Sequence, residues 1–247
     1  MRIQCRVPMA ALILAAHSMC FAQEGADVYA DPQNLEVLPS DIPPAELRAT
    51  MKNFSIGTGL RCNDCHVGEE GQDFSSYDFA SDEKEHKRTA REMLKMVRAI
   101  NGEYLAALGE DHDVQVECVT CHRGVPEPRL TGQVLTGAAE EGGAPAIPAK
   151  WGELRAEYYG THSFDFSELT LSEFARARFA AGKPNEARAA LEILVDEHPD
   201  SLMGHFMLGE IERIQGNVDA ARAHFQRALE IDHQADWVRQ QLEALDS

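Results

Sequence analysis

The amino-acid sequence predicts an all-α protein with little regular sheet, on three observations. Two segments, 44–54 and 84–108, carry helix-forming residues between start and stop signals. The motif Cys-x-x-Cys-His occurs twice, at residues 62–66 and 118–122. The C-terminal third repeats itself with a period of 34 residues, which is typical of paired helices. These features divide the chain into four expected parts: 1–22, 23–130, 131–166 and 167–247.

The composition is that of an ordinary soluble chain of one or two domains, with 247 residues, 44% of them apolar and 26% charged. The formal net charge is −18. This acidity argues against nucleic acid and against an anionic membrane surface as partners, because both favour a basic protein surface. A partner protein with a basic surface stays open.

The first 22 residues have the pattern of a secretory signal peptide. Arg2 and Arg6 form a short basic region, an apolar stretch too short to span a bilayer follows, and Ala22 precedes a polar segment. We therefore expect cleavage after Ala22 and a periplasmic or otherwise extracytoplasmic protein. An uncleaved anchor is the alternative, while bulky Met19 disfavours a lipid anchor on Cys20.

All four cysteines that remain after such cleavage lie in the two Cys-x-x-Cys-His motifs. The motif residues are Cys62, Cys65 and His66, and Cys118, Cys121 and His122. This motif is the attachment signature of c-type haem. The two thiols form thioether bonds to one porphyrin edge, and the adjacent histidine reaches the iron. We therefore expect two covalently attached haem c groups per chain.

Zinc and local disulfides are the alternatives for these cysteines. Zinc ribbons usually have about 15–20 residues between their Cys-x-x-Cys pairs. Here 52 residues separate Cys65 from Cys118, and a histidine follows each pair. Haem attachment outside the cytoplasm also agrees with the export signal, so the sequence favours haem.

Methionine on the first helical segment is a candidate sixth ligand. Met51 lies in the segment 44–54, and Gly57 and Gly59 are expected to end this helix before the first motif. A helix, a tight turn and the attachment site can fold back over one porphyrin and place Met51 opposite His66. The alternative is that Met51 fills a gap in the core.

The segment 84–108 is expected to cover the second haem. Its apolar side chains recur at three- and four-residue steps and so share a face: Met93, Met96, Val97, Ile100, Tyr104 and Leu108. Either Met96 or Met93 can reach the iron, but not both. His86 and His112 are rival ligands that would give a bis-histidine haem of lower potential.

Residues 34–130 resemble the haem-binding half of the photosynthetic reaction-centre cytochrome c subunit family. The resemblance rests on IPPAELRATMKNFSIGTGLRCNDCHV and on TAREMLKMVRAINGEYLAAL with ECVTCHRGVPEP. That family repeats a unit of a methionine-bearing helix, a turn and Cys-x-x-Cys-His, binds haem covalently and transfers electrons. The resemblance supports Met51 for the first haem and supports Met96 less well, because four-haem members take a histidine from their other half at the site most like the second one. It does not imply photosynthesis, because two-haem relatives with extra domains look like general electron carriers.

The segment 131–166 changes character. Residues 131–150 are rich in Gly, Ala and Pro and predict a linker. Residues 151–166 carry five aromatic residues: Trp151, Tyr158, Tyr159, Phe164 and Phe166. Such a density favours packing between two domains over an exposed recognition strip.

Residues 167–247 resemble tetratricopeptide repeats. Gly182 and Gly216 are 34 residues apart, as are Ala187 and Ala221. Residues 236–245 resemble the capping helix of such an array. These repeats commonly form a concave surface for a peptide or protein, and the alternative is a brace docked on the cytochrome domain.

Two functional classes fit these parts. One is an electron carrier in which both irons are six-coordinate. The other is a haem enzyme, a peroxidase or small-molecule reductase, which needs one open iron with polar groups beside it. A methionine is available for each iron and the sequence shows no distinct acid–base cluster. We therefore expect an exported dihaem cytochrome that carries electrons between redox partner proteins, with the repeats for docking or bracing.

Overall fold

The computed structural model describes residues 27–109 and 113–246. The expected signal peptide, Cys20 and His112 lie outside this part of the chain. Within it the chain forms eleven α-helices, a few shorter helical turns and one isolated bridge, between Val67 and Asp78. The all-α prediction is confirmed. No helix of the described residues is long and apolar enough to cross a membrane.

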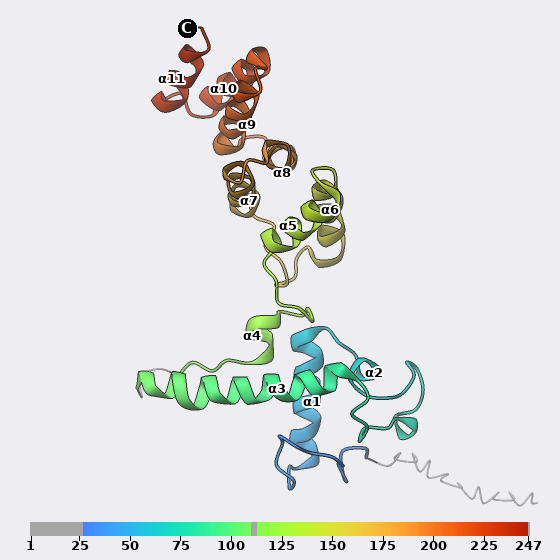
Figure 1. Cartoon of the computed structure of the whole chain (residues 1–247). Coiled ribbons are helices and arrows are strands. Elements are labelled where there is room, and N and C mark those ends of the chain that lie inside the picture. Colours follow the sequence, from blue (N-terminus) through green and yellow to red (C-terminus); the bar gives the residue numbers. More distant parts are fainter. Residues whose placement is uncertain (1–26, 110–112, 247) are drawn as a thin grey trace, which may run out of the picture.

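Residues 27–130 hold four of these helices. They are α1 (Pro44–Thr58), α2 (Cys62–Cys65), α3 (Glu85–Ala99) and α4 (Cys118–His122). The two short helices are the two Cys-x-x-Cys motifs, and the two long helices run in different directions (Figure 1). Helix α1 packs against α4, and α2 packs against α3. The first motif therefore contacts the helix that precedes the second motif, and the second motif contacts the helix that precedes the first.

Helix α1 begins and ends largely where the sequence places it. Pro44 stands at the first helical position, where its missing N–H is not needed. The helix continues through Gly57 and ends at Gly59, which has the left-handed φ of +72° typical of a C-terminal cap. The prediction that Gly57 also ends the helix was therefore wrong.

The single apolar face predicted for the segment 84–108 exists only in its first part. After α3 the chain forms a π-helical turn, η2 (Ile100–Leu105), and then a 3-10 turn, η3 (Ala106–Leu108). A π-helical turn inserts one residue and so rotates later side chains by about 100°. Tyr104 and Leu108 are accordingly 69% and 59% exposed. They do not cover the second attachment site.

Residues 131–246 form three successive helical hairpins and a final helix. These are α5 (Thr131–Gly142) with α6 (Ala146–Tyr158), α7 (Glu168–Ala180) with α8 (Pro184–Glu197), α9 (Leu202–Ile214) with α10 (Val218–Ile231), and α11 (Asp236–Ala244). Each hairpin packs on the next. In Figure 1 they follow one another as a column that begins beside α4. The stack thus has a third hairpin before the two predicted from the 34-residue period.

The linker predicted for residues 131–150 was wrong, because this segment forms α5 and the start of α6. Leu135 and Ile147 are fully buried in the same cluster as Leu171. The composition was misleading for a physical reason. Small residues allow close helix packing, and Pro148 lies in the first turn of α6, where a helix tolerates proline.

The aromatic segment packs onto the repeats and joins them to the rest of the chain. Trp151 is buried, contacts the Phe166 ring at 5.2 Å and donates from Nε1 to the Glu197 carboxylate at 2.8 Å. Buried Ser163 donates from its hydroxyl to the carbonyl oxygen of Arg123 at 2.7 Å. That bond ties the start of the helical stack to the residue directly after the second motif.

Candidate haem site

One continuous cavity in residues 27–130 connects both attachment motifs. It is lined by all six motif residues, Cys62, Cys65, His66, Cys118, Cys121 and His122. The four thiols are free. The two motifs, which lie far apart in the sequence, therefore share one cavity.

The described candidates for the sixth ligand line the same cavity. They are Met51, His86, Met93 and Met96. Met93 and Met96 are 39% and 46% exposed although they lie on the apolar face of α3. Both residues line the cavity and are not covered by protein, which leaves them available as ligands. Met51 for the first site and Met96 for the second remain proposals, with Met93 and His86 as alternatives for the second.

Both motifs form a helical turn in the same way. The backbone N–H of Arg61 donates to the Asp64 carboxylate at 2.7 Å, and that of Glu117 donates to the Thr120 hydroxyl at 3.0 Å. Each acceptor sits directly before the second cysteine of its motif. A polar residue there satisfies an amide at the helix start. This capping role was missed in the sequence, where both residues count only as spacers.

The first histidine is surrounded by apolar and cationic groups. The His66 ring meets the Phe79 ring edge-on at a centroid distance of 4.9 Å. Its Nδ1 atom is buried and makes no hydrogen bond. Burial lowers the pKa of His66, the charge of Lys87 lowers it further, and the backbone of Phe79 acts in the opposite direction. The lowered pKa favours the neutral imidazole, which is the form that binds a metal.

The second histidine has a backbone partner. His122 Nδ1 lies 3.0 Å from the carbonyl oxygen of buried Val125. An Nδ1–H that donates to this oxygen leaves Nε2 unprotonated and fixes the ring orientation. Such a second hydrogen bond is typical of a histidine that binds a metal.

Helix α1 touches the second motif through glycines. A Cβ atom on Gly57 would lie only 2.7 Å from Cys118 Cβ, and one on Gly59 would collide with the carbonyl oxygen of Gly124. The Gly124 N–H also donates to the Gly57 carbonyl oxygen at 2.8 Å. The helix that carries Met51 is thus in backbone contact with the other attachment site.

Asn101 connects the end of α3 to the second motif. From the π-helical turn its amide donates to the Val116 carbonyl oxygen at 2.9 Å and accepts from the Val116 N–H at 2.8 Å. This pair of bonds holds the extended chain two residues before Cys118. An asparagine inside a helix is the sequence signal that was available, because its side chain competes for backbone groups.

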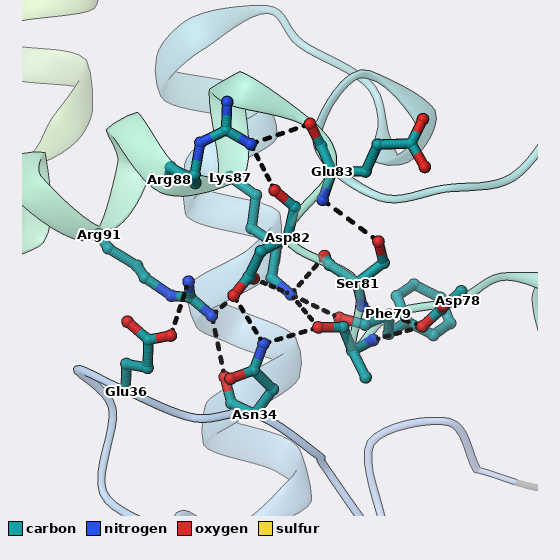
Figure 2. Close-up of polar contacts among 11 residues, drawn as sticks. Asn34, Glu36, Asp78, Phe79, Ser81, Asp82, Glu83, Lys87, Arg88 and Arg91 are labelled. Atoms are coloured by element: carbon teal, nitrogen blue, oxygen red, sulfur yellow. Dashed lines mark hydrogen bonds and ion pairs between the residues drawn. The ribbon is translucent and has the colours of Figure 1, made fainter.

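Figure 2 shows a network of ion pairs around Asp82, in which Glu36, Lys87 and Arg91 also line the cavity. Asp82 lies 3.0 Å from Lys87 Nζ and 2.9 Å from Arg91 Nη2, and it accepts from the Asn34 amide at 3.0 Å. Arg91, Asn34 and Lys87 hold the pKa of the Asp82 carboxyl well below its usual range. Glu36 pairs with Arg91 at 3.1 Å. Through Asn34 and Glu36, the network connects the segment before α1 to the first turns of α3.

These residues fit covalently bound haem. Each motif offers two free thiols and an imidazole, and apolar side chains including Leu47, Phe54 and Leu94 line the cavity. Among the described residues, no three His, Cys, Asp or Glu side chains converge so that they could hold a metal ion by themselves, as a zinc site requires.

Comparison with known proteins agrees with this geometry. The model of the photosynthetic reaction centre cytochrome c subunit family matches residues 9–181, and the tetratricopeptide repeat model matches residues 172–236. A cytochrome c-554 of Chloroflexus aurantiacus is 32% identical over 99 residues, which are 40% of this chain and 22% of that protein. A photosynthetic reaction center cytochrome c subunit of Thermochromatium tepidum is 30% identical over 149 residues, 60% of this chain and 32% of that protein.

The chain therefore spans less than a third of the length of these two relatives. The family match nevertheless covers most of the chain, including both motifs and the helices α1 and α3. It implies covalently bound haem c. The chain belongs to the photosynthetic reaction-centre cytochrome c subunit family and carries a tetratricopeptide repeat region behind its cytochrome part.

Proposed function

We propose that this protein is an exported dihaem cytochrome that carries electrons between redox partner proteins. The observation that carries the proposal is the single cavity lined by both Cys-x-x-Cys-His motifs. Two haem groups attached there share one enclosure, which favours electron exchange between them. The helical repeats dock a partner or brace the cytochrome region.

Each motif residue has a definite role in this proposal. Cys62 and Cys65 bind one haem and Cys118 and Cys121 the other, while His66 and His122 bind the irons through Nε2. Met51 is the sixth ligand of the first haem and Met96 that of the second. A bound haem c supplies a one-electron couple of ferric and ferrous iron.

Three charged side chains on the cavity wall, Glu36, Lys87 and Arg91, favour a carrier over a haem enzyme. Lys87, Arg91, Asp82 and Glu36 are bonded to one another rather than left available for proton transfer. A peroxidase or reductase would need an open iron beside such a free group. Rapid binding of carbon monoxide to the reduced protein would favour the enzyme.

Partners and location follow from charge and the N-terminal pattern. The net charge of −18 suits redox partners with basic surfaces. The expected signal peptide at residues 1–22 would deliver the chain to the periplasm or another extracytoplasmic space, where haem c is attached.

A pyridine haemochrome assay joined to intact mass tests the haem number. We expect two haem c equivalents per chain that survive denaturation, and a mass that lacks residues 1–22. Cys121→Ala should lose most of one equivalent. One equivalent or none in the wild type would contradict the dihaem proposal.

The sixth ligand of the first haem is tested by substitution of Met51. Met51→Ala should remove one near-infrared band of methionine-bound ferric haem and open that iron to carbon monoxide. Met203→Ala is the matched control, because Met203 lies on α9 among the repeats and is 44% exposed. Wild-type spectra for both variants would make Met51 a packing residue.

A further inference from the structure

The two attachment sites differ in what surrounds the side of each imidazole that faces away from the iron. His122 Nδ1 has a backbone oxygen, that of Val125, at 3.0 Å. His66 Nδ1 is buried and makes no hydrogen bond. The helical turns of the two motifs are otherwise closed by the same kind of bond. The two sites therefore differ in the groups that lie beside Nδ1 of each histidine.

Lys87 shares the backbone acceptor that lies beside His66. The backbone beside the His66 ring is that of Phe79, and the Phe79 carbonyl oxygen already accepts from Lys87 Nζ at 2.9 Å. Lys87 Nζ also donates to the carbonyl oxygens of Ala80 at 2.9 Å and Ser81 at 2.8 Å. The ammonium thus competes for the oxygen that an imidazole N–H would use, which makes this oxygen a weaker acceptor for His66, and it adds a positive charge near the ring.

The network in Figure 2 holds this ammonium in place. Asp82 pairs with Lys87 at 3.0 Å and is itself fixed by Arg91 at 2.9 Å. The Lys87 side chain is only 12% exposed. Arg91 and Lys87 together balance the charges of Asp82 and Glu36, so loss of the Lys87 charge would leave the network with a net negative charge.

The two differences affect the balance between ferric and ferrous iron in the same sense, and both favour ferrous iron more at His66 than at His122. A hydrogen bond from Nδ1–H to an acceptor raises the basicity of a metal-bound histidine, which stabilises the more positive metal. A nearby cation destabilises the more positive metal by Coulomb repulsion. His122 has the acceptor, whereas His66 has the cation.

We propose that Lys87 is a positioning residue that raises the midpoint potential of the haem bound at His66 above that of the haem bound at His122. This inference rests on the proposed dihaem function. The resulting difference in potential favours electron transfer inside the protein from the second site to the first. Lys87 acts through the Phe79 carbonyl and His66 rather than as a ligand of the iron.

A redox titration of the full holoprotein with Lys87→Gln tests this proposal. Two one-electron steps are expected in the wild type. In the variant the higher step should fall and the lower one stay nearly unchanged. The equilibrium constant between the sites should fall by about tenfold, which is about 59 mV for a one-electron couple.

Two further variants make the test specific. Lys87→Arg keeps the charge and should retain most of the separation between the steps. Arg88→Gln is the matched control. Arg88 neighbours Lys87 and also donates to backbone carbonyl oxygens, but to those of Asp82 and Glu83 rather than to that of Phe79 beside His66. Its titration should match the wild type.

The possible failures are distinguishable. Two steps that keep their wild-type separation in Lys87→Gln would overturn the role of Lys87, and a fall confined to the lower step would reverse the order of the sites. A wild-type protein with fewer than two haem equivalents would instead refute the proposed function, before any variant is measured.

Discussion

The cytochrome region and the repeat region bury their apolar side chains in different ways. Of the 22 buried hydrophobic residues in the described part of the chain, only Ile42, Leu47 and Val125 belong to residues 27–130. The other 19 lie in residues 131–246, where all of them except Leu154 belong to two core clusters. The repeats therefore carry a protein core, and the cytochrome region does not.

In the cytochrome region the cavity takes the place of a core. Apolar side chains of α1 and α3 face it, among them Leu47, Met51 and Met96. Covalently bound haem would cover these side chains and contribute the apolar contacts that the protein lacks. From this comparison we expect that residues 131–246 fold on their own side chains, whereas residues 27–130 depend on covalently bound haem for their apolar contacts.

The largest expected effect comes from preventing haem attachment. A variant with alanine at all four motif cysteines should lose the fold of residues 27–130 while the repeats stay folded, because only the latter have a buried core. Hydrogen exchange followed by mass spectrometry should show full exchange in α1 and α3 and protection in α8 and α9. Protection of α1 and α3 equal to that in the holoprotein would break the comparison.

Truncation of the repeat core should have the opposite pattern. Leu191 on α8 is fully buried, so Leu191→Ala should lower the free energy of unfolding of the repeats by about 2–5 kcal/mol. The haem spectrum should not change. Arg176→Ala, on the exposed face of α7, is the control and should cost less than about 0.5 kcal/mol. A shifted haem spectrum in Leu191→Ala would show that the two regions fold as one unit.

A smaller effect is expected where α1 meets the second motif. The added methyl group in Gly57→Ala would lie 2.7 Å from Cys118 Cβ and force the helix away, at a cost of about 1–3 kcal/mol. Although Gly57 precedes the first motif, the spectrum and potential of the second haem should change. Gly152→Ala in α6 meets nothing within 4 Å and should leave both haems unchanged. A change confined to the first haem would contradict the contact.

The smallest effect concerns pH and the repeats alone. Burial and neighbouring His205 lower the pKa of His224 below its ordinary 6.5, with Arg188 acting in the same direction and Glu212 against it. The Nδ1 atoms of the two histidines lie 3.3 Å apart, so one must donate and the other accept. The unfolded state binds this proton more readily than the folded state. The contribution of His224 to the stability of the repeats is therefore fully present above about pH 6.5 and is lost as the pH falls below that value.

Thermal unfolding at pH 7.5 and pH 5.5 checks this dependence. The Tm of the repeats should fall at the lower pH, and His224→Gln should remove most of that fall. His162→Gln changes an exposed histidine and serves as the control. An equal fall in the wild type and in His224→Gln would assign the pH dependence to other groups.

Much of this molecule could be predicted because it depends on short spacings. The two-residue gap of each Cys-x-x-Cys-His motif, Pro44 at the start of α1 and Gly59 at its end all act within a few residues. The 34-residue period likewise repeats a local helical hairpin. Motifs, helix positions and the all-α class follow from such local physics without any knowledge of the tertiary structure.

Other features depend on which backbones approach one another. Residues 131–150 have the composition of a linker, yet stacking on α7 and α8 makes them a hairpin. Glycine is a residue type that often ends a helix, yet Gly57 lies inside α1. Its missing side chain leaves the space that Cys118 occupies. A pattern of residue types along one segment contains no information about such a neighbour.

The sequence by itself determined the haem-binding residues to be expected, the helices that carry candidate ligands and the repeats. Only the tertiary structure placed both motifs on one cavity and gave His66 and His122 different surroundings. Lys87 shows the reason most clearly. Its charge acts on His66 through the Phe79 carbonyl, across 21 positions of sequence, and long-range electrostatics depends on distance in space rather than on spacing along the chain.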